Sequence, residues 1–231
     1  QQQQQQQQQA AAAAAAATAA AAAAAAAEAR EKNLLHGART GFRAGLDRAE
    51  AKLSRAASPQ RRSELEAAFG KKVDALLQAA EEGLSAAEVA LPKCAAAAKE
   101  MRASAEPARA RLAEANDAKQ RDAASRALAR FARELESLES GVESRVQPLG
   151  AAALMQQFDE TKADLQASAL GELRSAVDDE LLVMTTRDMA SSAAAVWARL
   201  SRSNQARLLR IKAEADLREQ RQRALSLAEK K

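Results

Sequence analysis

The chain has 231 residues, no tyrosine, one tryptophan, one cysteine and one histidine, and a formal net charge of +4. Alanine, leucine, glutamate and arginine dominate it, and these are strong helix formers, whereas β-branched residues are scarce. This composition excludes a β-rich fold and a disulfide framework, and it predicts an all-α fold of long helices packed by small side chains. Because Cys94 has no partner cysteine, we expect an intracellular, cytoplasmic protein in which this thiol is buried or half-buried.

Residues 1–27 are nine glutamines followed by alanines that are interrupted only by Thr18. This leader has no patterned apolar face, so its alanines can extend the first helix by propensity but cannot select a partner. We expect the glutamines to be disordered or to form a fraying helical extension. The alanine run is long enough to span a bilayer, but its weak hydrophobicity and polar flanks predict that it does not. We therefore expect that deleting the leader leaves stability and oligomeric state unchanged.

Prolines divide the first half of the remaining chain. Ser58-Pro59 is typical of an N-cap followed by proline at the first helical position. We therefore expect a first helix that ends near Ala57 and a second that begins at Pro59. Further on, Ser85 and Glu88 form a capping-box pattern. This pattern either restarts a helix or lies inside a continuous helix that is kinked at Pro92.

The second half contains longer helical stretches. Ser104–Pro107 predicts the start of a helix that runs to about Val146, and Pro148–Gly150 is the clearest break in the chain. After this break the helical pattern continues to the end, with weak points at Thr185–Thr186 and Ser201–Asn204.

Apolar residues before the Pro148 break follow heptad spacing, which predicts a helix–helix seam. The seam consists of Leu128, Phe131, Leu135, Leu138 and Val142. It covers about two heptads, so an intrachain three- or four-helix bundle satisfies it as well as a coiled coil does. We expect an elongated antiparallel bundle with coiled-coil-like packing over residues 28–200, followed by a basic charged terminal helix over 201–231.

Three glycines, Gly37, Gly41 and Gly45, recur at every fourth position, so we expect them near one helix face. A glycine inside a helix costs about 1 kcal/mol relative to alanine, which calls for a compensating reason. Close helix packing is our interpretation, and a flexible hinge or a partner site are the alternatives.

Catalytic patterns are missing from the sequence. His36 is the only histidine, so neither a zinc site nor a histidine-assisted nucleophile is expected. The chain contains no GxxxxGK[ST] or GxGxxG motif. We therefore predict no catalytic residue, no metal site and no cofactor, and we do not expect an enzyme.

Charge is unevenly distributed along the chain. Residues 132–184 carry eleven acidic and four basic side chains, whereas residues 199–231 carry ten basic and four acidic ones. The basic side chains that we single out are Arg199, Arg202, Arg207, Arg210, Arg218, Arg221 and Arg223. The acidic and basic regions can pair with each other or with partners, and the basic helix can also lie on an anionic membrane through Leu200, Leu208, Ile211 and Leu217.

Nucleic-acid binding by the basic terminal helix is not expected. Acidic residues are interleaved with its arginines, and no aromatic side chain follows Trp197 for base stacking. From the residues alone we expect a non-catalytic structural or interaction module that acts by helix–helix association with a protein partner or with itself.

Three stretches have the helical spacing of a known protein class. They read SELEAAFGKKVDALLQAAEEG, FDETKADLQASALGELRSAVDDELL and RLLRIKAEADLREQRQRALSLAEKK. Residues 31–231 thereby resemble the helical region behind the GTPase domain of guanylate-binding-protein and atlastin-like large GTPases. The resemblance implies a lever and a self-association surface coupled to a GTPase domain outside this chain. It carries over no catalytic residue, because the nucleotide-binding motifs are missing here.

Overall fold

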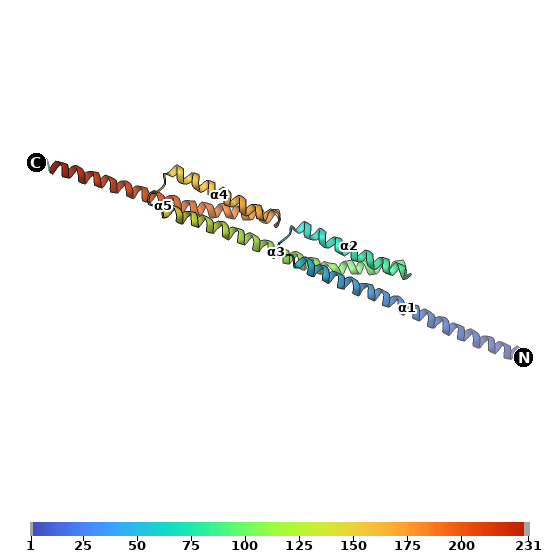
Figure 1. The fold of residues 1–231 in the computed structure, drawn as a ribbon. Coiled ribbons are helices and arrows are strands. Elements are labelled where there is room, and N and C mark those ends of the chain that lie inside the picture. Colours follow the sequence, from blue (N-terminus) through green and yellow to red (C-terminus); the bar gives the residue numbers. More distant parts are fainter. Residues whose placement is uncertain (1, 229–231) are drawn as a thin grey trace. The chain divides into compact units, whose positions relative to one another are not determined.

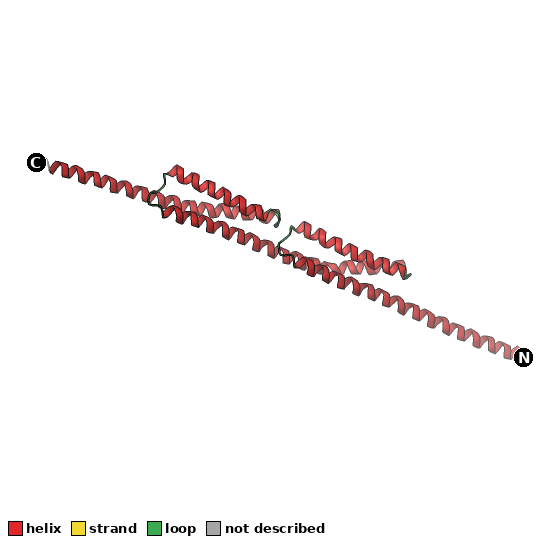
Figure 2. Ribbon diagram, in the orientation of Figure 1, coloured by secondary structure: helices red, strands yellow, loops and turns green. Residues whose placement is uncertain are grey.

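A computed structural model gives the fold, describing the backbone of residues 2–228 and the side chains of residues 13–224 and 226. Five helices and no strand occur in this described part (Figures 1 and 2). They are α1 (Gln2–Ser54), α2 (Arg62–Ala86), α3 (Leu91–Glu143), α4 (Ala151–Leu173) and α5 (Asp179–Ala228). The predicted all-α class with bundled helices is confirmed.

The helices form two compact units. Unit 1 contains the residues up to Ala57 together with Ser63–Ala115, and unit 2 contains Ser58–Arg62 together with the residues from Asn116 onward. The division falls inside α3, so its first part belongs to unit 1 and its second part to unit 2. These units differ from the single bundle that we expected over residues 28–200, because the apolar side chains separate into two cores rather than one.

The core of unit 1 is built from the end of α1, from α2 and from the first part of α3. Its largest fully buried side chain is Phe69 of α2. The buried residues come from these three segments and, for Val89, from the loop between α2 and α3. They are Phe42, Leu46, Leu65, Phe69, Val73, Leu77, Leu84, Val89, Cys94, Ala97, Met101, Ala105, Ala108 and Leu112. Unit 1 is therefore a three-helix bundle around one hydrophobic core.

Unit 2 contains the second part of α3, α4 and the first part of α5 around a second core. The most deeply buried of its large side chains are Phe131, Leu135, Val142, Val177, Met189 and Leu200. Because these side chains come from α3, from α5 and from the loop before α5, and pack with those of α4, unit 2 is also a three-helix bundle.

The α1–α2 loop is longer than the sequence suggested. Helix α1 ends at Ser54 and α2 begins at Arg62, so the prediction that Pro59 occupies the first helical position is wrong. A hydrogen bond from the backbone N–H of Gln60 to Asn116 Oδ1 (3.0 Å) holds the loop. The N–H of Arg62 donates to the Asp178 carboxylate (2.9 Å), and α2 begins at that residue.

Two expected helix boundaries lie inside continuous helices instead. Pro107 does not start a helix, because α3 already begins at Leu91 and its buried residues Met101 and Ala105 hold the segment before the proline in unit 1. The threonine pair is also helical, since the hydroxyls of Thr185 and Thr186 donate to carbonyl oxygens four residues earlier.

The chain breaks instead between α4 and α5, at residues 174–178, where we expected a continuous helix. Proline and glycine are both absent from this loop, so the strongest sequence signals of a break are missing. The side chain of Val177 turns into the core of unit 2, with 0% of its surface exposed. Because Val177 continues the apolar spacing of α4, the sequence pattern predicts a continuous helix across this loop.

The leader continues α1, which begins at Gln2. Of the two expectations for the glutamines, the structure agrees with a helical extension. Within the described residues, no helix is both long and apolar enough to cross a bilayer.

Candidate functional site

The two units repeat the same core at an offset of 88 or 89 residues. Phe42 and Phe131 are both 2% exposed, and Met101 and Met189 are 2% and 0% exposed. Identical residues also occur in the pairs Leu46/Leu135, Pro59/Pro148, Leu65/Leu154, Phe69/Phe158, Leu84/Leu173, Val89/Val177, Leu112/Leu200 and Asn116/Asn204. The chain therefore contains a tandem repeat of one three-helix unit.

An arginine–glutamate pair is repeated at the same offset. In unit 1, Arg111 of α3 donates from Nε and Nη2 to both carboxylate oxygens of Glu50 in α1 (2.8 and 2.6 Å). In unit 2, Arg199 of α5 binds Glu139 of α3 in the same manner (3.1 and 2.8 Å). Each pair joins the first and third helical segments of its unit, and its fork geometry fixes their register.

The hydrogen bond from Arg111 holds the pKa of Glu50 below its usual value, although partial burial of the carboxyl opposes the shift. The same contact raises the pKa of Arg111, and Glu139 raises the pKa of Arg199. Both arginines are about half exposed, at 59% and 48% of their side-chain surface. These pairs are therefore structural contacts of modest strength rather than reactive groups.

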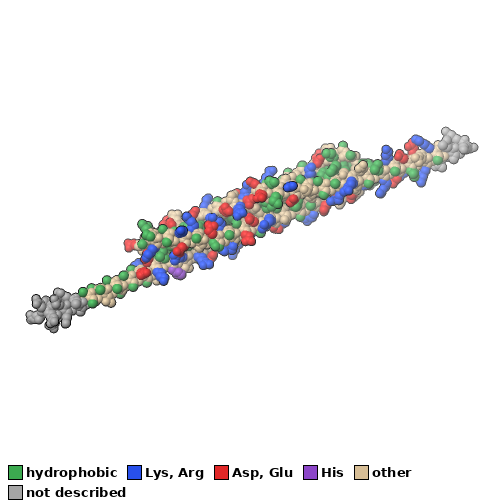
Figure 3. Space-filling view, turned by 180° about the vertical axis from the view of Figure 1, so that it is seen from behind, with side chains coloured by type: hydrophobic (Ala, Val, Ile, Leu, Met, Phe, Trp, Pro, Cys, Tyr) green, Lys and Arg blue, Asp and Glu red, His purple; other side chains and the backbone are tan. Residues whose placement is uncertain are grey.

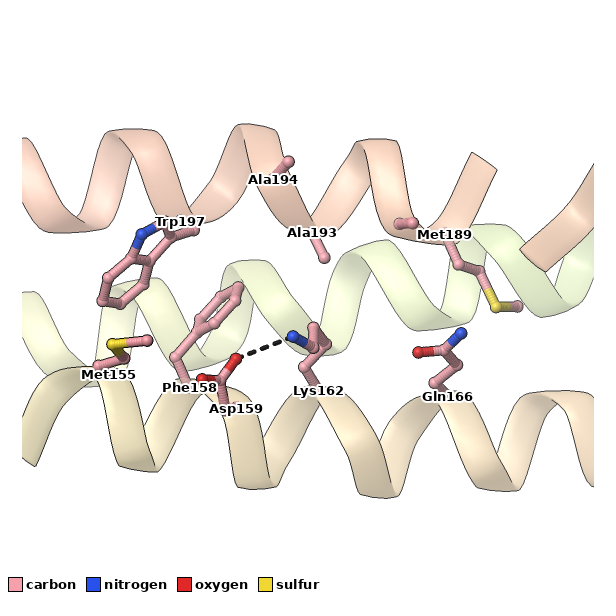
Figure 4. Close-up of a pocket in the computed structure, with 10 residues that line it drawn as sticks. Met155, Phe158, Asp159, Lys162, Gln166, Met189, Ala193, Ala194 and Trp197 are labelled. Atoms are coloured by element: carbon pink, nitrogen blue, oxygen red, sulfur yellow. Dashed lines mark hydrogen bonds and ion pairs between the residues drawn. The ribbon is translucent and has the colours of Figure 1, made fainter. Parts of the chain in front are cut away.

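Unit 2 has an open groove between α4 and α5 (Figure 4). Its volume is about 320 Å³. Met155, Phe158 and Lys162 line it from α4, and Met189 and Trp197 line it from α5. Three alanines of α5, Ala190, Ala193 and Ala194, complete its wall. A mostly apolar concave surface with a few polar groups is suited to binding another apolar group.

Two core residues of the repeat are replaced at the groove. In unit 1, Val73 and Leu77 of α2 are buried at 4% exposure each. The residues 89 positions later are Lys162 and Gln166, and both line the groove. Since the polar ends of lysine and glutamine stay near water, they leave open the space that valine and leucine occupy in unit 1.

Two aromatic rings form one end of the groove. The ring centroids of Phe158 and Trp197 are 5.1 Å apart with a tilt of 45°. Lys162 Nζ lies 6.0 Å from the Phe158 ring centroid and donates to Asp159 Oδ1 at 2.8 Å (Figure 4). The groove thus combines an aromatic and methionine surface with an ion pair at its edge, and methionine adapts readily to different bound shapes.

The predicted heptad seam lies in unit 2. Phe131, Leu135 and Val142 are buried in its core, and Leu128 and Leu138 are partly buried against it. Because an intrachain bundle already covers these five side chains, they do not form a free surface.

Of the three spaced glycines, only Gly45 lies in a close contact. A Cβ atom added there would come within 2.4 Å of Leu76 Cδ2, whereas Gly37 and Gly41 have no neighbour within 4 Å of such an atom. The expectation of close packing is therefore wrong for Gly37 and Gly41. Each fourth residue drifts by about 40° around a helix, so the three positions do not share one contact line.

The seven arginines singled out from the sequence do not form one basic surface. Arg199 is bound to Glu139, and Arg207 donates to the carbonyl oxygens of Val142 and Arg145. Arg202 donates to the carbonyl of its own helix at Ala198 (2.8 Å).

The remaining four arginines lie on the exposed end of α5. Arg218 pairs with Glu214 (3.9 Å) and Arg223 pairs with Glu219. Arg210 and Arg221 are exposed. Pairing within the helix reduces the positive field that this end offers to a polyanion.

Residues with reactive side chains are not brought together. His36 is exposed on α1, and Cys94 is buried in unit 1 with its thiol 3.5 Å from the Val89 carbonyl oxygen. Among the described residues no group of histidine, cysteine, aspartate and glutamate side chains has the arrangement of a metal site.

The sequence reasoning missed the groove because it missed the repeat. Comparing the chain with itself at an offset of 89 would have aligned Phe69 with Phe158 and revealed the exchange of Val73 for Lys162. Alanine-rich helices hide such a signal, since alanine matches alanine at almost every offset. No family model, no curated protein and no solved structure matches this chain.

Proposed function

We propose that this chain is a non-catalytic α-helical structural and interaction module that acts through helix–helix association. The observation that carries the proposal is the continuation of α5 beyond the core of unit 2. The last core residue on α5 is Leu200, whereas the helix extends to Ala228. We call residues 205–224 the tail of α5.

The tail has apolar side chains without a core to enter. Leu209 is 61% exposed, Leu217 is 50% exposed, Ile211 is 47% exposed and Leu208 is 37% exposed. Acidic and basic side chains alternate around them (Figure 3). Leu208 and Ile211 lie on one face of the helix, and Leu209 and Leu217 lie on another. Packing such side chains against another helix would stabilise the tail, since propensity alone stabilises an isolated helix only marginally.

Binding of a membrane surface or a nucleic acid by the tail has less support. Arg199 and Arg207 are occupied inside unit 2, and the tail carries three acidic residues among six basic ones. Flotation with anionic vesicles and a salt titration with single-stranded DNA test these alternatives, and we expect no binding at physiological ionic strength.

Sedimentation equilibrium of the whole chain over a wide concentration range tests the proposed function. We expect reversible association that is weakened when the tail is removed after Asn204. A chain that remains monomeric at all concentrations, and that cross-links to no helical partner, would contradict the proposal.

A further inference from the structure

We propose that the groove of unit 2 binds the tail of α5 from a second copy of this chain. The proposal rests on the proposed function and names the surface and the partner for it. Two observations support it: the shape of the missing side chains and the position of the tail on α5.

Comparison of the two repeats shows which side chains are missing from the groove of unit 2. Unit 1 fills the equivalent space with Val73 and Leu77, two aliphatic side chains one helical turn apart. The best occupant of the groove is therefore a pair of aliphatic side chains about one turn apart on a helix. Leu208 and Ile211 of the tail form such a pair, because residues three apart are neighbours on a helix surface.

The tail also has the small residue that close packing requires. Ala215 lies one turn beyond Ile211 on the same face, so the contact surface continues as leucine, isoleucine and alanine at heptad spacing. The α5 wall of the groove is itself made of Ala190, Ala193 and Ala194, which allow another helix to approach closely.

A chain cannot fill its own groove in this way. Helix α5 is continuous from Asp179 to Ala228, so Trp197 and Leu208 are separated by about 17 Å along one helix. The tail therefore extends beyond the groove of its own unit, and a bound tail must come from another molecule. Since each copy has one groove and one tail, reciprocal exchange between two copies gives a closed dimer.

The charges of the groove do not oppose a basic helix. Of the four acidic residues of α4, only Asp159 lines the groove, and it is paired with Lys162. The tail carries six basic and three acidic residues, and Arg207 is already bound to carbonyl oxygens of unit 2. We therefore expect a mainly apolar contact that depends only weakly on salt.

Unit 1 supplies a matched variant for the test. The double substitution Lys162→Val with Gln166→Leu gives unit 2 the two buried residues that unit 1 has at these positions. Their side chains should occupy the groove and leave no space for a bound helix. The paired variant Leu208→Gln with Ile211→Gln removes the apolar face of the tail, and Leu209→Gln, which lies on a different face, is the control.

Sedimentation equilibrium and the fluorescence of Trp197 give two independent measurements. Trp197 is the only tryptophan and it lines the groove, so its emission reports directly on groove occupancy. We expect the emission to shift to shorter wavelength as the wild-type chain associates. Either double variant should raise the dissociation constant at least about tenfold, and the control should change it less than about twofold.

The outcomes separate this proposal from the function on which it rests. If the chain associates but the groove-filled variant associates equally well, the tail–groove contact is wrong while the association function stands. If association is unchanged by both double variants and Trp197 emission is independent of concentration, another surface is responsible. If the wild-type chain stays monomeric, the tail–groove contact is wrong, and the association function fails as well only if the chain also cross-links to no helical partner. Circular dichroism shows whether each variant retains its helices.

Discussion

Unit 1 and unit 2 share most of their core positions, yet they differ at the surface where α4 and α5 form the groove of unit 2. Phe42 and Phe69 of unit 1 have buried counterparts in Phe131 and Phe158 of unit 2. The differences include two positions one turn apart on the middle helix, where valine and leucine are replaced by lysine and glutamine, and the position of Trp197, where unit 1 has Arg109. A repeated bundle can thus keep its fold while side-chain exchanges change the shape of its surface.

The largest expected effect on the free energy of unfolding comes from placing the lysine and glutamine of the groove at the equivalent positions of unit 1. Val73→Lys with Leu77→Gln removes two buried aliphatic side chains and should destabilise the chain by about 4 kcal/mol. Urea denaturation followed by circular dichroism measures this loss. The reverse exchange in unit 2, Lys162→Val with Gln166→Leu, should stabilise its bundle in the same assay. A small change in unit 1 would show that its core is less closely packed than its burial indicates.

The next largest effect concerns the repeated asparagines. Asn116 accepts a hydrogen bond from the Gln60 N–H and donates one to the Gln60 carbonyl (3.0 and 2.7 Å). Asn204 donates to the Leu149 carbonyl, and its Oδ1 atom has no partner within the described structure. Asn116→Ala should therefore cost about 2 kcal/mol and Asn204→Ala about 1 kcal/mol, as measured by urea denaturation. Equal costs would contradict this difference.

The Arg111–Glu50 pair of unit 1 should have a smaller and pH-dependent effect. The lowered pKa of Glu50 means that its contact stabilises the folded state above the unfolded pKa of about 4.3 and is lost as the pH falls through the folded pKa. Glu50→Gln should thus destabilise the chain by about 0.5–1 kcal/mol at pH 7 and by much less at pH 3. Thermal unfolding at the two pH values tests this.

The smallest effect is expected for the leader. Residues 13–27 are exposed, and the core of unit 1 does not include them. Deleting residues 1–27 should leave the denaturation midpoint and the sedimentation behaviour unchanged within error. A loss of stability would mean that the alanine helix contributes to unit 1.

Much of the fold could be predicted from local signals in the sequence. Strong helix formers predict the all-α class, and the heptad spacing from Leu128 to Val142 marks a segment that packs in unit 2. Pro148 also lies in the loop between α3 and α4. These features depend on residues that are close together in the chain.

Features that depend on distant residues were not predicted. Arg62 begins α2 beside the carboxylate of Asp178, which lies 116 positions away. The groove likewise needs α4 and α5 to be placed together before Phe158 and Trp197 can meet. Only a comparison of the sequence with itself would have indicated that the second unit departs from the first.

The loop between α2 and α3 contains the residue that makes the two repeats unequal in length. Five steps separate Leu84 from Val89, whereas four separate their counterparts Leu173 and Val177. Glu88 in this loop adopts a φ of 58°, the left-handed conformation that non-glycine residues rarely take. One residue added inside a helix would turn every later side chain by about 100° and misalign the core. The α2–α3 loop is therefore the permissive site of the chain, where an epitope tag or a fluorescent label can be inserted while both bundles keep their register.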